Sequence, residues 1–431
     1  MTISSIIKKL YPFDYSIVGD GNDLAIKEFK KLLPFKVHNF RSGKIYNGWK
    51  IPHKWILKKA QIKENGKIIF DAKQKKFGVP VNSKSFTGFV SLEKLRRNIF
   101  YSKKLPNATP YNWTGLYRYE KKSWGFCMSK KEFNKIDKKK YFVDIETSQK
   151  KGQMKVLEFT LKGSNKDTII INAHNCHPFQ ANDDISGCAV GIKLFQMLRK
   201  LKKRKFTYTL LIAPELIGPI FWLKKNSKKV KNFRHAILLK SVGNKNSLKL
   251  QHSVNQNSEI DKLAIKYLKD LGEKYSTGKF RTIYGNDEIV FDSTGYKINT
   301  ISFTRFPFKE YHTDMDTPES LSEEKLLKTY ELIKKIILDF ESEIRFRNKY
   351  RGVISLSNPK YNLYLNAEAP GIDKKKYTNE MKKWNLLMNN LPRFIDNGMS
   401  LREIAKYHSL NYKNVFSYFK KWENKKLIEI V

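Results

Sequence analysis

Apolar and polar positions show two different periodic patterns between about Tyr141 and Arg345. Short apolar runs of the β type recur there, and segments with apolar residues every three or four positions separate them. The runs that predict strands are Thr168–Ile171, Thr207–Ala213, His235–Leu239 and Asn299–Phe303. The segments that predict helices are Ile185–Leu201, Glu259–Leu271 and Glu319–Phe340, the last with a helix start at Thr317-Pro318. Strand–helix alternation is typical of βαβ units, so we expect an α/β domain with a mixed, mostly parallel sheet flanked by helices.

The segment from Gly43 to about Cys127 has a different texture. It is rich in aromatic residues, glycine and proline, and it carries short β-type runs such as Lys67–Asp71. This pattern predicts a small, mostly β module that precedes the α/β segment.

The end of the chain predicts a small helical module. Phe346–Gly371, with its Asn, Pro and Gly residues, is typical of a connector. The three predicted helices are Met381–Leu391, closed by Pro392, then Leu401–His408, capped by Ser400, and Asn411–Lys425. A β-like stretch, Leu427–Val431, ends the chain. The outline favours a helix-turn-helix or winged-helix module.

Composition limits the class of protein. The 431 residues are 40% hydrophobic and 29% charged, which is a globular composition and not that of a disordered, collagen-like or disulfide-rich chain. The three cysteines give no disulfide framework. The N-terminus lacks the pattern of a signal peptide, and the longest apolar run, Tyr208–Leu223, is interrupted by Pro214, Glu215 and Pro219. We therefore expect a soluble cytoplasmic protein with no membrane span.

Charge is the outlying feature of the composition. The 84 Lys and Arg residues exceed the 41 Asp and Glu residues, for a net charge of +43, which favours acidic partners. The predicted helical module from Gly371 onward is no more basic than the chain average, and its third helix contains no arginine. Compositional bias accounts for such an even spread, so nucleic-acid binding is not favoured. A domain–domain or homodimer contact is the better expectation for this module.

Polar residues that can bind metals follow three of the four strand-like runs. His174 and His177 follow the first run and precede Asp183, Glu215 follows the second, and His312 lies beyond the fourth. In open α/β sheets ligands bind outside the carboxyl ends of the strands. Imidazole and carboxylate groups that arrive there from distant segments suit a hydrolytic zinc site with one position left for water.

These residues lie in motifs that resemble a known family. Ala181–Gly187 resembles the Ala-Asn-Asp-Asn-x-Ser-Gly signature of the bacterial zinc aminopeptidase and glutamate carboxypeptidase group, and Tyr311–Thr317 resembles its Tyr-His-Thr-x-x-Asp-Thr. The chain resembles more closely the aminopeptidase-like proteins first described as a domain of unknown function, many of which have a C-terminal winged helix. The further marks of that family are Ser42-Gly43, Trp49–Pro52, Trp55, Trp124–Cys127, Cys176–Pro178 and Pro214–Gly218. The likeness extends from about Ile6 to the end.

The resemblance implies an architecture and a setting. The implied fold is an aminopeptidase-like (phosphorylase/hydrolase-type) α/β domain formed by residues 1–44 and 131–350. Residues 45–130 are implied to be an inserted β-rich domain, and residues 372–431 a winged-helix-like domain. One or two zinc ions and a bacterial cytoplasmic setting follow from the same likeness, as does a link to genes for surface-polysaccharide synthesis.

The resemblance also implies roles for the metal-binding residues. Asp183 matches the metal-bridging aspartate, and His312 matches the last histidine ligand. His177, in Cys176-His177-Pro178, matches the first histidine ligand, with His174 as its rival because Ala173-His174 also resembles the aminopeptidases. Cys176, between the two histidines, is expected to be a buried apolar residue rather than a ligand.

Two departures from the family pattern concern the metal count. Pro214-Glu215 replaces a pair of glutamates, so Glu215 serves either as the general base or as a ligand. Asn244 stands near the strand end where the aminopeptidases have an aspartate ligand. Together the departures favour a single tightly bound zinc.

Further residues are assigned around this set. Asp287 and Tyr311 are expected to contact the substrate. Asp287 is expected to bind an ammonium group of the substrate, and the alternative is that it is a turn carboxylate. Asp314 and Asp316 are expected to orient a ligand imidazole, and helix capping is the alternative for Asp316.

Two hypotheses of different classes follow. The first is a zinc hydrolase that cleaves a peptide or amide bond of a peptide-like or amino-acyl small substrate, with Glu215 as base. The second is a catalytically degenerate relative that binds a ligand and regulates through its winged helix.

Overall fold

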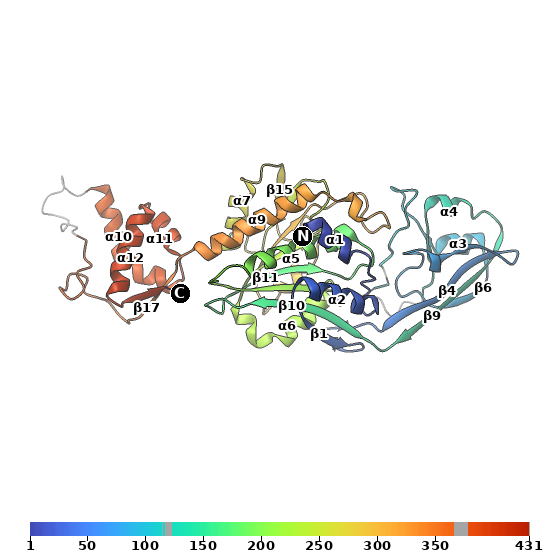
Figure 1. Ribbon diagram of the computed structural model, residues 1–431, viewed down its shortest axis with the longest axis horizontal. Coiled ribbons are helices and arrows are strands. Elements are labelled where there is room, and N and C mark those ends of the chain that lie inside the picture. The colour runs from blue at the N-terminus through green and yellow to red at the C-terminus, as the bar shows by residue number, and fades with distance from the viewer. Residues whose placement is uncertain (114, 117–122, 366–377, 431) are drawn as a thin grey trace. The chain divides into compact units, whose positions relative to one another are not determined.

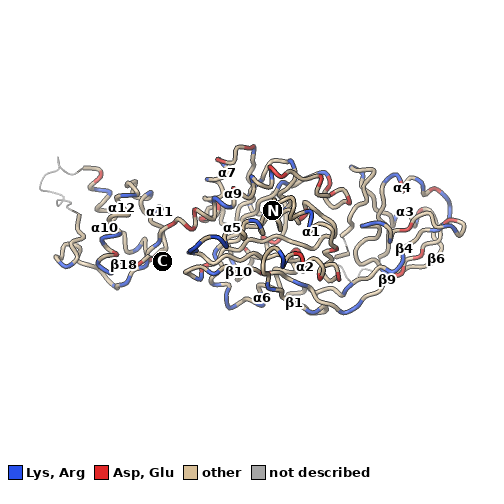
Figure 2. Tube along the Cα trace, in the orientation of Figure 1, with Lys and Arg blue, Asp and Glu red and all other residues tan. Residues whose placement is uncertain are grey.

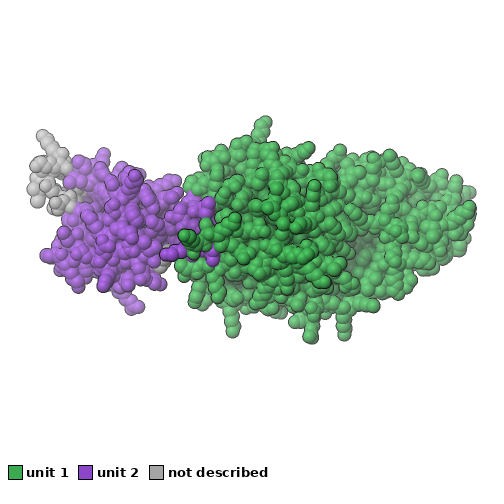
Figure 3. All heavy atoms as spheres, viewed as in Figure 1, with its two compact units in different colours: residues 1–202, 207–336 green, residues 203–206, 337–431 purple. Residues whose placement is uncertain are grey.

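The structure is a computed structural model that describes residues 1–113, 115–116, 123–365 and 378–430. These residues form two compact units, coloured green and purple in Figure 3. The first unit comprises residues 1–202 and 207–336, and the second comprises residues 203–206 and 337–431.

An eight-stranded mixed sheet forms the centre of the first unit (Figure 1). Its strands, in spatial order, are β1 (Lys36–Arg41), β10 (Gln153–Leu161), β12 (Thr207–Ala213), β11 (Thr168–His174), β13 (Phe233–Lys240), β16 (Asn299–Thr304), β14 (Leu248–Gln251) and β15 (Tyr275–Gly278). The four central strands β12, β11, β13 and β16 are parallel to one another. β1 and β10 pair antiparallel at one edge, and β14 pairs antiparallel with β16 near the other.

The central strands are apolar without alternation because both faces of the sheet are covered. All seven residues of β11 are buried, as are the last six residues of β12 and of β13. Such continuous burial is typical of parallel sheets with helices on both faces. Figure 1 shows α5 (Ser186–Leu198) on one face and α6 (Ile217–Lys225) on the other. The predicted α/β class with a mixed sheet flanked by helices is confirmed.

The remaining helices surround this sheet. They are α1 (Ile3–Leu10), α2 (Gly21–Leu32), α7 (Glu259–Leu268), α8 (Glu288–Phe291) and α9 (Glu323–Ser342). The predicted helix start at Thr317-Pro318 is wrong for α9. Pro318–Ser320 forms a separate 3₁₀ turn, and the extended backbone of Leu321 then interrupts the helix, which begins at Glu323.

A four-stranded antiparallel sheet organises the β module, with strand order β5 (Lys67–Asp71), β4 (Lys54–Glu64), β9 (Lys140–Lys150) and β6 (Phe86–Ser91). Smaller pairs are β2 (Ile45–Tyr46) with β3 (Trp49–Lys50) and β7 (Ile99–Phe100) with β8 (Phe126–Cys127). A 3₁₀ turn (Ala72–Gln74) and helices α3 (Leu92–Arg97) and α4 (Lys130–Asn134) complete the module. β9 follows residue 130 in the chain and nevertheless completes this sheet. The domain boundaries at 44/45 and 130/131 stay predictions.

The described part of the second unit includes the end of α9, three further helices and a two-stranded ribbon. The helices are α10 (Asn379–Asp396), α11 (Leu401–Tyr407) and α12 (Tyr412–Asn424), and β17 (Phe346–Asn348) pairs antiparallel with β18 (Ile428–Ile430). The predicted stop at Pro392 is wrong, because α10 continues through it. Leu391 and Ile395 on either side are buried in the core, and the Asn348 side chain donates to the Pro392 carbonyl at 2.8 Å. The winged-helix assignment, and the domain limits 372–431, stay predictions.

Charged residues are distributed over both units. Figure 2 shows Lys and Arg along the whole described trace rather than in one segment. Among the described residues, no helix is both long and apolar enough to cross a membrane.

Candidate metal centre

The predicted metal-binding residues come from the carboxyl ends of adjacent parallel strands. His174 ends β11, Glu215 follows β12 by two residues, and β13 between Phe233 and Lys240 lies on the other side of β11. Asp183 lies in the turn that leads into α5, and His312 lies in the loop after β16. The order of the strands therefore gathers these residues at one edge of the sheet, as the sequence predicted.

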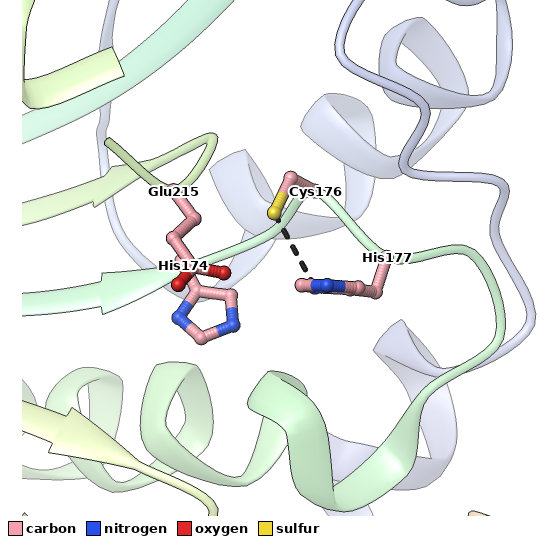
Figure 4. Close-up of side chains that lie close together, drawn as sticks. All are labelled: His174, Cys176, His177 and Glu215. Carbon is pink, nitrogen blue, oxygen red and sulfur yellow. Dashed lines mark hydrogen bonds between the residues drawn. The ribbon is translucent and has the colours of Figure 1, made fainter. Parts of the chain in front are cut away.

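Two overlapping groups of side chains could each hold a metal ion. In one group, His177, Asp183 and His312 offer ligand atoms that all lie within 4.8 Å of one another. In the other group, the ligand atoms also lie within 4.8 Å of one another and belong to His174, Cys176, His177 and Glu215. Figure 4 shows these four side chains. His177 belongs to both groups.

The first group contains two buried polar atoms that suit a metal. Asp183 Oδ2 and His312 Nε2 are 3.1 Å apart, and neither has a hydrogen-bond partner among the described residues. Two ligands on a tetrahedral zinc with bonds of about 2.0 Å would lie roughly 3.3 Å apart. Buried polar atoms without partners are costly, so this pair fits a bound cation better than it fits an empty apolar cavity.

The charges within the first group are also those of metal ligands. Burial and the neighbouring cationic groups hold the pKa of His177 well below its ordinary value, although Asp183 opposes this, so its imidazole is neutral. Burial raises the pKa of Asp183, but Lys240 and the three neighbouring histidines outweigh it and hold the pKa well below its ordinary value. A neutral imidazole beside an ionised carboxylate is the state in which both bind zinc.

His174 contacts the same aspartate in a different way. Its Nε2 lies 2.9 Å from Asp183 Oδ1, and its Nδ1 lies 3.6 Å from Asp184 Oδ2. Burial and Lys240 lower the pKa of His174, but the two aspartates raise it to about 9. The imidazole is hydrogen-bonded to Asp183 through Nε2, and its Nδ1 has no hydrogen-bond partner among the described residues, so His174 stays a candidate metal ligand.

Cys176 supports His177 rather than the cluster as a whole. Its Sγ lies 3.3 Å from His177 Nδ1, the contact drawn as a dashed line in Figure 4. Burial raises the pKa of the Cys176 thiol well above its ordinary value, so it is a neutral group. With Nδ1 engaged by sulfur, Nε2 is the nitrogen of His177 that can face a metal.

A lysine that sequence reasoning missed lies in the cluster. Lys240, the last residue of β13, is 3% exposed, and its Nζ lies 3.4 Å from Asp183 Oδ1 and 3.9 Å from Glu215 Oε1. Burial lowers its pKa, but Asp183 and Glu215 raise it well above the ordinary value, so the group stays an ammonium. The only sequence signal was a lysine directly after a continuous apolar run. Asn244, which had been compared with a ligand aspartate, instead donates to the Arg305 carbonyl at 3.2 Å.

Two further aspartates hold the loop that carries Asp183. Asp316 accepts the backbone N–H groups of Asn182 and Asp183 at 2.7 and 3.1 Å. Asp184, joined to Asp183 by a cis peptide bond, accepts from the N–H groups of Ser241 and Gly187 at 2.9 and 3.1 Å. Gly187 is required here because a Cβ atom would lie 2.6 Å from the Asp184 carboxylate.

The described contacts of Asp314 and Asp316 differ from the expected ones. Asp316 holds backbone amides, and Asp314 accepts the N–H of Thr109 at 2.9 Å. Asp314 thereby fastens the β module to the loop that carries His312. Tyr111, from the same part of that module, donates its N–H to the His312 carbonyl at 2.8 Å, and its ring contacts the rings of His177 and His312.

Tyr311 and Asp287 lie close to the cluster. The Tyr311 ring stacks on the His312 imidazole with a centroid distance of 3.8 Å. Asp287 is fully buried, and its Oδ1 accepts the N–H of Leu216 at 2.5 Å. Burial and the Glu215 charge raise the pKa of Asp287 to about 8. Its contact with an ammonium group of the substrate stays a prediction.

Several of these loops have a strained backbone. Leu216 and His312 have φ of 60° and 53°, in the left-handed region that non-glycine residues seldom adopt. Strain of this kind costs of order 1–3 kcal/mol per residue and concentrates at functional sites. Both residues lie next to or within the cluster, which supports a functional origin for its geometry.

A cavity of about 510 Å³ is lined by residues next to Glu215 and Asp287 in the sequence, but by none of the candidate metal ligands. Leu216 and Asn286, the neighbours of Glu215 and Asp287, line it, and so do Tyr46 and Trp49 of the β2–β3 hairpin. Its volume is in the range of small-molecule sites.

Fold and site together define an α/β protein with a cluster of His, Cys, Asp and Glu residues that could hold a metal ion at the carboxyl edge of its sheet. The comparisons agree with this class. The chain belongs to the family described as "Domain of unknown function (DUF4910)", whose pattern matches residues 4–343. A relative in Clostridium acetobutylicum, described as "Putative polysaccharide biosynthesis protein with aminopeptidase-like domain", is 28% identical over 349 residues, which are 80% of this chain and 79% of the relative.

Solved structures give the same fold. A crystal structure of a "putative peptidase" from Clostridium acetobutylicum is similar with a TM-score of 0.75 and 25% identity, over 100% of this chain and 96% of that one. A zinc aminopeptidase from Bacillus subtilis is similar with a TM-score of 0.57 and 14% identity, over 79% of this chain and 94% of that one. An aminopeptidase from Aneurinibacillus sp. strain AM-1 gives a TM-score of 0.54 at 16% identity, over 78% and 92% of the two chains. The aminopeptidase-like fold is thereby shown.

Proposed function

We propose that this protein is a zinc-dependent hydrolase of the aminopeptidase fold that cleaves a peptide or amide bond in a peptide-like or amino-acyl small substrate. One zinc ion is held by His177, Asp183 and His312. The observation that carries the proposal is the pair of buried, unpartnered atoms Asp183 Oδ2 and His312 Nε2, 3.1 Å apart beside a neutral His177. Three protein ligands with one open position are the usual arrangement of catalytic zinc.

Zinc, when bound, supplies Lewis-acid polarisation of a carbonyl and a water molecule of lowered pKa. Glu215 has the role of general base. Its carboxylate lies within 4.8 Å of the His177 ligand atom, so a water beside His177 lies within reach of it. His174 and Lys240 hold Asp183 from its other oxygen, and Tyr311 holds the ring of His312 by stacking. The remainder of the substrate occupies the 510 Å³ cavity next to Leu216.

The biological setting is part of the proposal. The relative's name mentions polysaccharide biosynthesis, so we propose that the substrate belongs to surface-polysaccharide metabolism. A reducing bacterial cytoplasm as the compartment is consistent with three free, buried cysteines. We propose that the second unit mediates contacts between copies of the chain rather than recognising nucleic acid.

The test is metal analysis of the purified full-length protein. Wild type is expected to carry about one zinc per chain, and His312→Ala to lose it. His53→Ala is the matched control, because His53 contacts Ser42 and lies in neither metal-binding group. Zinc content unchanged in His312→Ala would remove the proposed ligand set.

A second candidate function rests on the residue before Glu215. Pro214 occupies the position of the other glutamate in the family pattern, so a single carboxylate follows β12. A protein that binds metal and ligand without turnover would have this arrangement. The two candidates are separated by hydrolysis of a panel of amino-acyl and N-acyl amides by wild type and Glu215→Gln. Turnover lost in Glu215→Gln supports the hydrolase, and no turnover by zinc-loaded wild type supports the binding protein.

A further inference from the structure

Lys240 has an unusual environment for a lysine. The side chain is 3% exposed at the end of a strand whose last six residues are all buried. Burying an ammonium group costs several kcal/mol unless anions compensate it. Here the anions are Asp183 and Glu215, both candidate metal-site residues, and the rings of Tyr284 and Tyr311 lie 5.7 and 5.8 Å from the ammonium. The fold thus places the buried positive charge of Lys240 inside the cluster.

The two oxygens of the Asp183 carboxylate face different partners. Oδ1 is contacted by His174 Nε2 at 2.9 Å and by Lys240 Nζ at 3.4 Å. Oδ2 faces His312 Nε2 and has no hydrogen-bond partner among the described residues. A carboxylate bridges two metal ions only when each oxygen is available to one of them. In this chain, His174 and the ammonium group of Lys240 already contact one of the two oxygens.

We infer that the ammonium group of Lys240 takes the position of a second metal ion, so that the site binds one dication, on the Oδ2 side of Asp183. The inference rests on the metal binding of the proposed function but not on its hydrolytic activity. A fixed lysine neutralises Asp183 and Glu215 as a second cation would, and a dication next to it would be repelled. At a separation of about 4 Å, two cations of charge +1 and +2 repel each other by several kcal/mol, even at an effective dielectric constant near 20.

This inference adds a reason to the single zinc favoured by the sequence. Missing ligands alone would weaken a second metal, whereas Lys240 excludes it. Lys240 is therefore a positioning residue that sets the number of metal ions. Its removal is expected to open a second position to a metal.

The experiment counts the metal ions bound to the full-length protein. Chelator-treated wild type is titrated with Co²⁺, whose visible absorption reports bound metal, and zinc is counted by mass spectrometry after dialysis. Wild type is expected to saturate at one equivalent. Lys240→Asp, which replaces the cation with a ligand-type carboxylate, is expected to bind two. The matched control Lys245→Asp, at an exposed position five residues along the chain, is expected to bind one.

The outcomes separate a failure of this inference from a failure of the proposed function. Two equivalents in wild type, with Lys240 in place, would overturn the inference and leave the proposed function standing. One equivalent in a folded Lys240→Asp would also overturn it. No metal in wild type would overturn the proposed function itself and this inference with it. If circular dichroism shows that Lys240→Asp does not fold, the inference is tested by the number of metal ions bound to wild type and by the more conservative variant Lys240→Met. Lys240→Met is expected to raise the affinity for a second Co²⁺ at least tenfold.

Discussion

At the scale of single residues, the sequence predicts which ligand-type side chains meet but not how they are paired. His174, His177, Asp183, Glu215 and His312 arrive at one sheet edge because strand ends impose it. The contacts of Asp314 and Asp316 with backbone amides depend on loop paths that no periodicity encodes. Lys240 was missed because lysine is not a metal ligand. Its role becomes visible only through its burial between two carboxylates.

Asp316 leads to a prediction about metal affinity. It accepts the N–H groups of Asn182 and Asp183, and Asp316→Asn would direct an amide NH₂ group against one of these donors. The loop that carries Asp183 should then shift, and zinc affinity should fall about 10- to 100-fold, as for other residues that orient metal ligands. A competition titration with a chromophoric chelator measures this affinity.

The control for this prediction is Asp270→Asn, at an exposed position in the same unit. It should leave zinc affinity unchanged. Equal affinities of Asp316→Asn and wild type would show that the hydrogen bonds to Asn182 and Asp183 do not position the metal-binding loop.

At the scale of elements, the central strands can be predicted from the sequence because they are continuously buried. The short strands towards the side of the sheet are harder to predict. The predicted strand Thr207–Ala213 coincides with β12, because a long apolar run fully specifies a buried parallel strand. The short strands β14 and β15, at one side of the sheet, have too few residues to show a pattern. The stop predicted at Pro392 failed because tertiary packing of Leu391 and Ile395 outweighs the local cost of a proline inside α10.

Glu158 links three elements, and its charge leads to a prediction about stability. Its carboxylate accepts from His38 of β1 and from Trp222 of α6, each at 2.8 Å. Burial raises the pKa of Glu158, but these hydrogen bonds outweigh it and lower the pKa from 4.5 to about 2. A depressed pKa contributes stability that is present above pH 4.5 and is lost as the pH falls towards 2.

Glu158→Gln is therefore expected to lower the free energy of unfolding by roughly 2 kcal/mol at pH 7, after allowance for screening by solvent. The difference from wild type should shrink as the pH falls from 4.5 towards 2. Urea denaturation of both proteins at pH 7, 4 and 3 measures it. A matched change at the exposed Glu93, Glu93→Gln, should have little effect at any pH. A difference for Glu158→Gln that stays constant with pH would show that the charge of Glu158 does not carry the effect.

At the scale of the whole molecule, composition predicts less than the net charge first suggests. The full sequence has a net charge of +43, and Figure 2 shows Lys and Arg along the described residues of both units. The ligand-type residues of the candidate site, by contrast, all lie between His174 and His312, inside the first unit. A net positive charge of this size supports non-specific attraction to polyanions.

This leads to a prediction about DNA binding by the full-length protein. Binding to a short duplex should be weak and should fall steeply with salt, because it arises from counterion release alone. Lys413 and Lys421 are exposed on α12 in the second unit, and Lys228 and Lys229 are exposed in the first unit. Replacing either pair by glutamine should weaken binding to the same small extent, because neither pair contacts base edges. Fluorescence anisotropy at 25 and 150 mM salt measures this. Loss of binding in the Lys413/Lys421 variant alone, with the other variant unchanged, would instead identify α12 as a recognition helix and favour the regulatory alternative over the hydrolase.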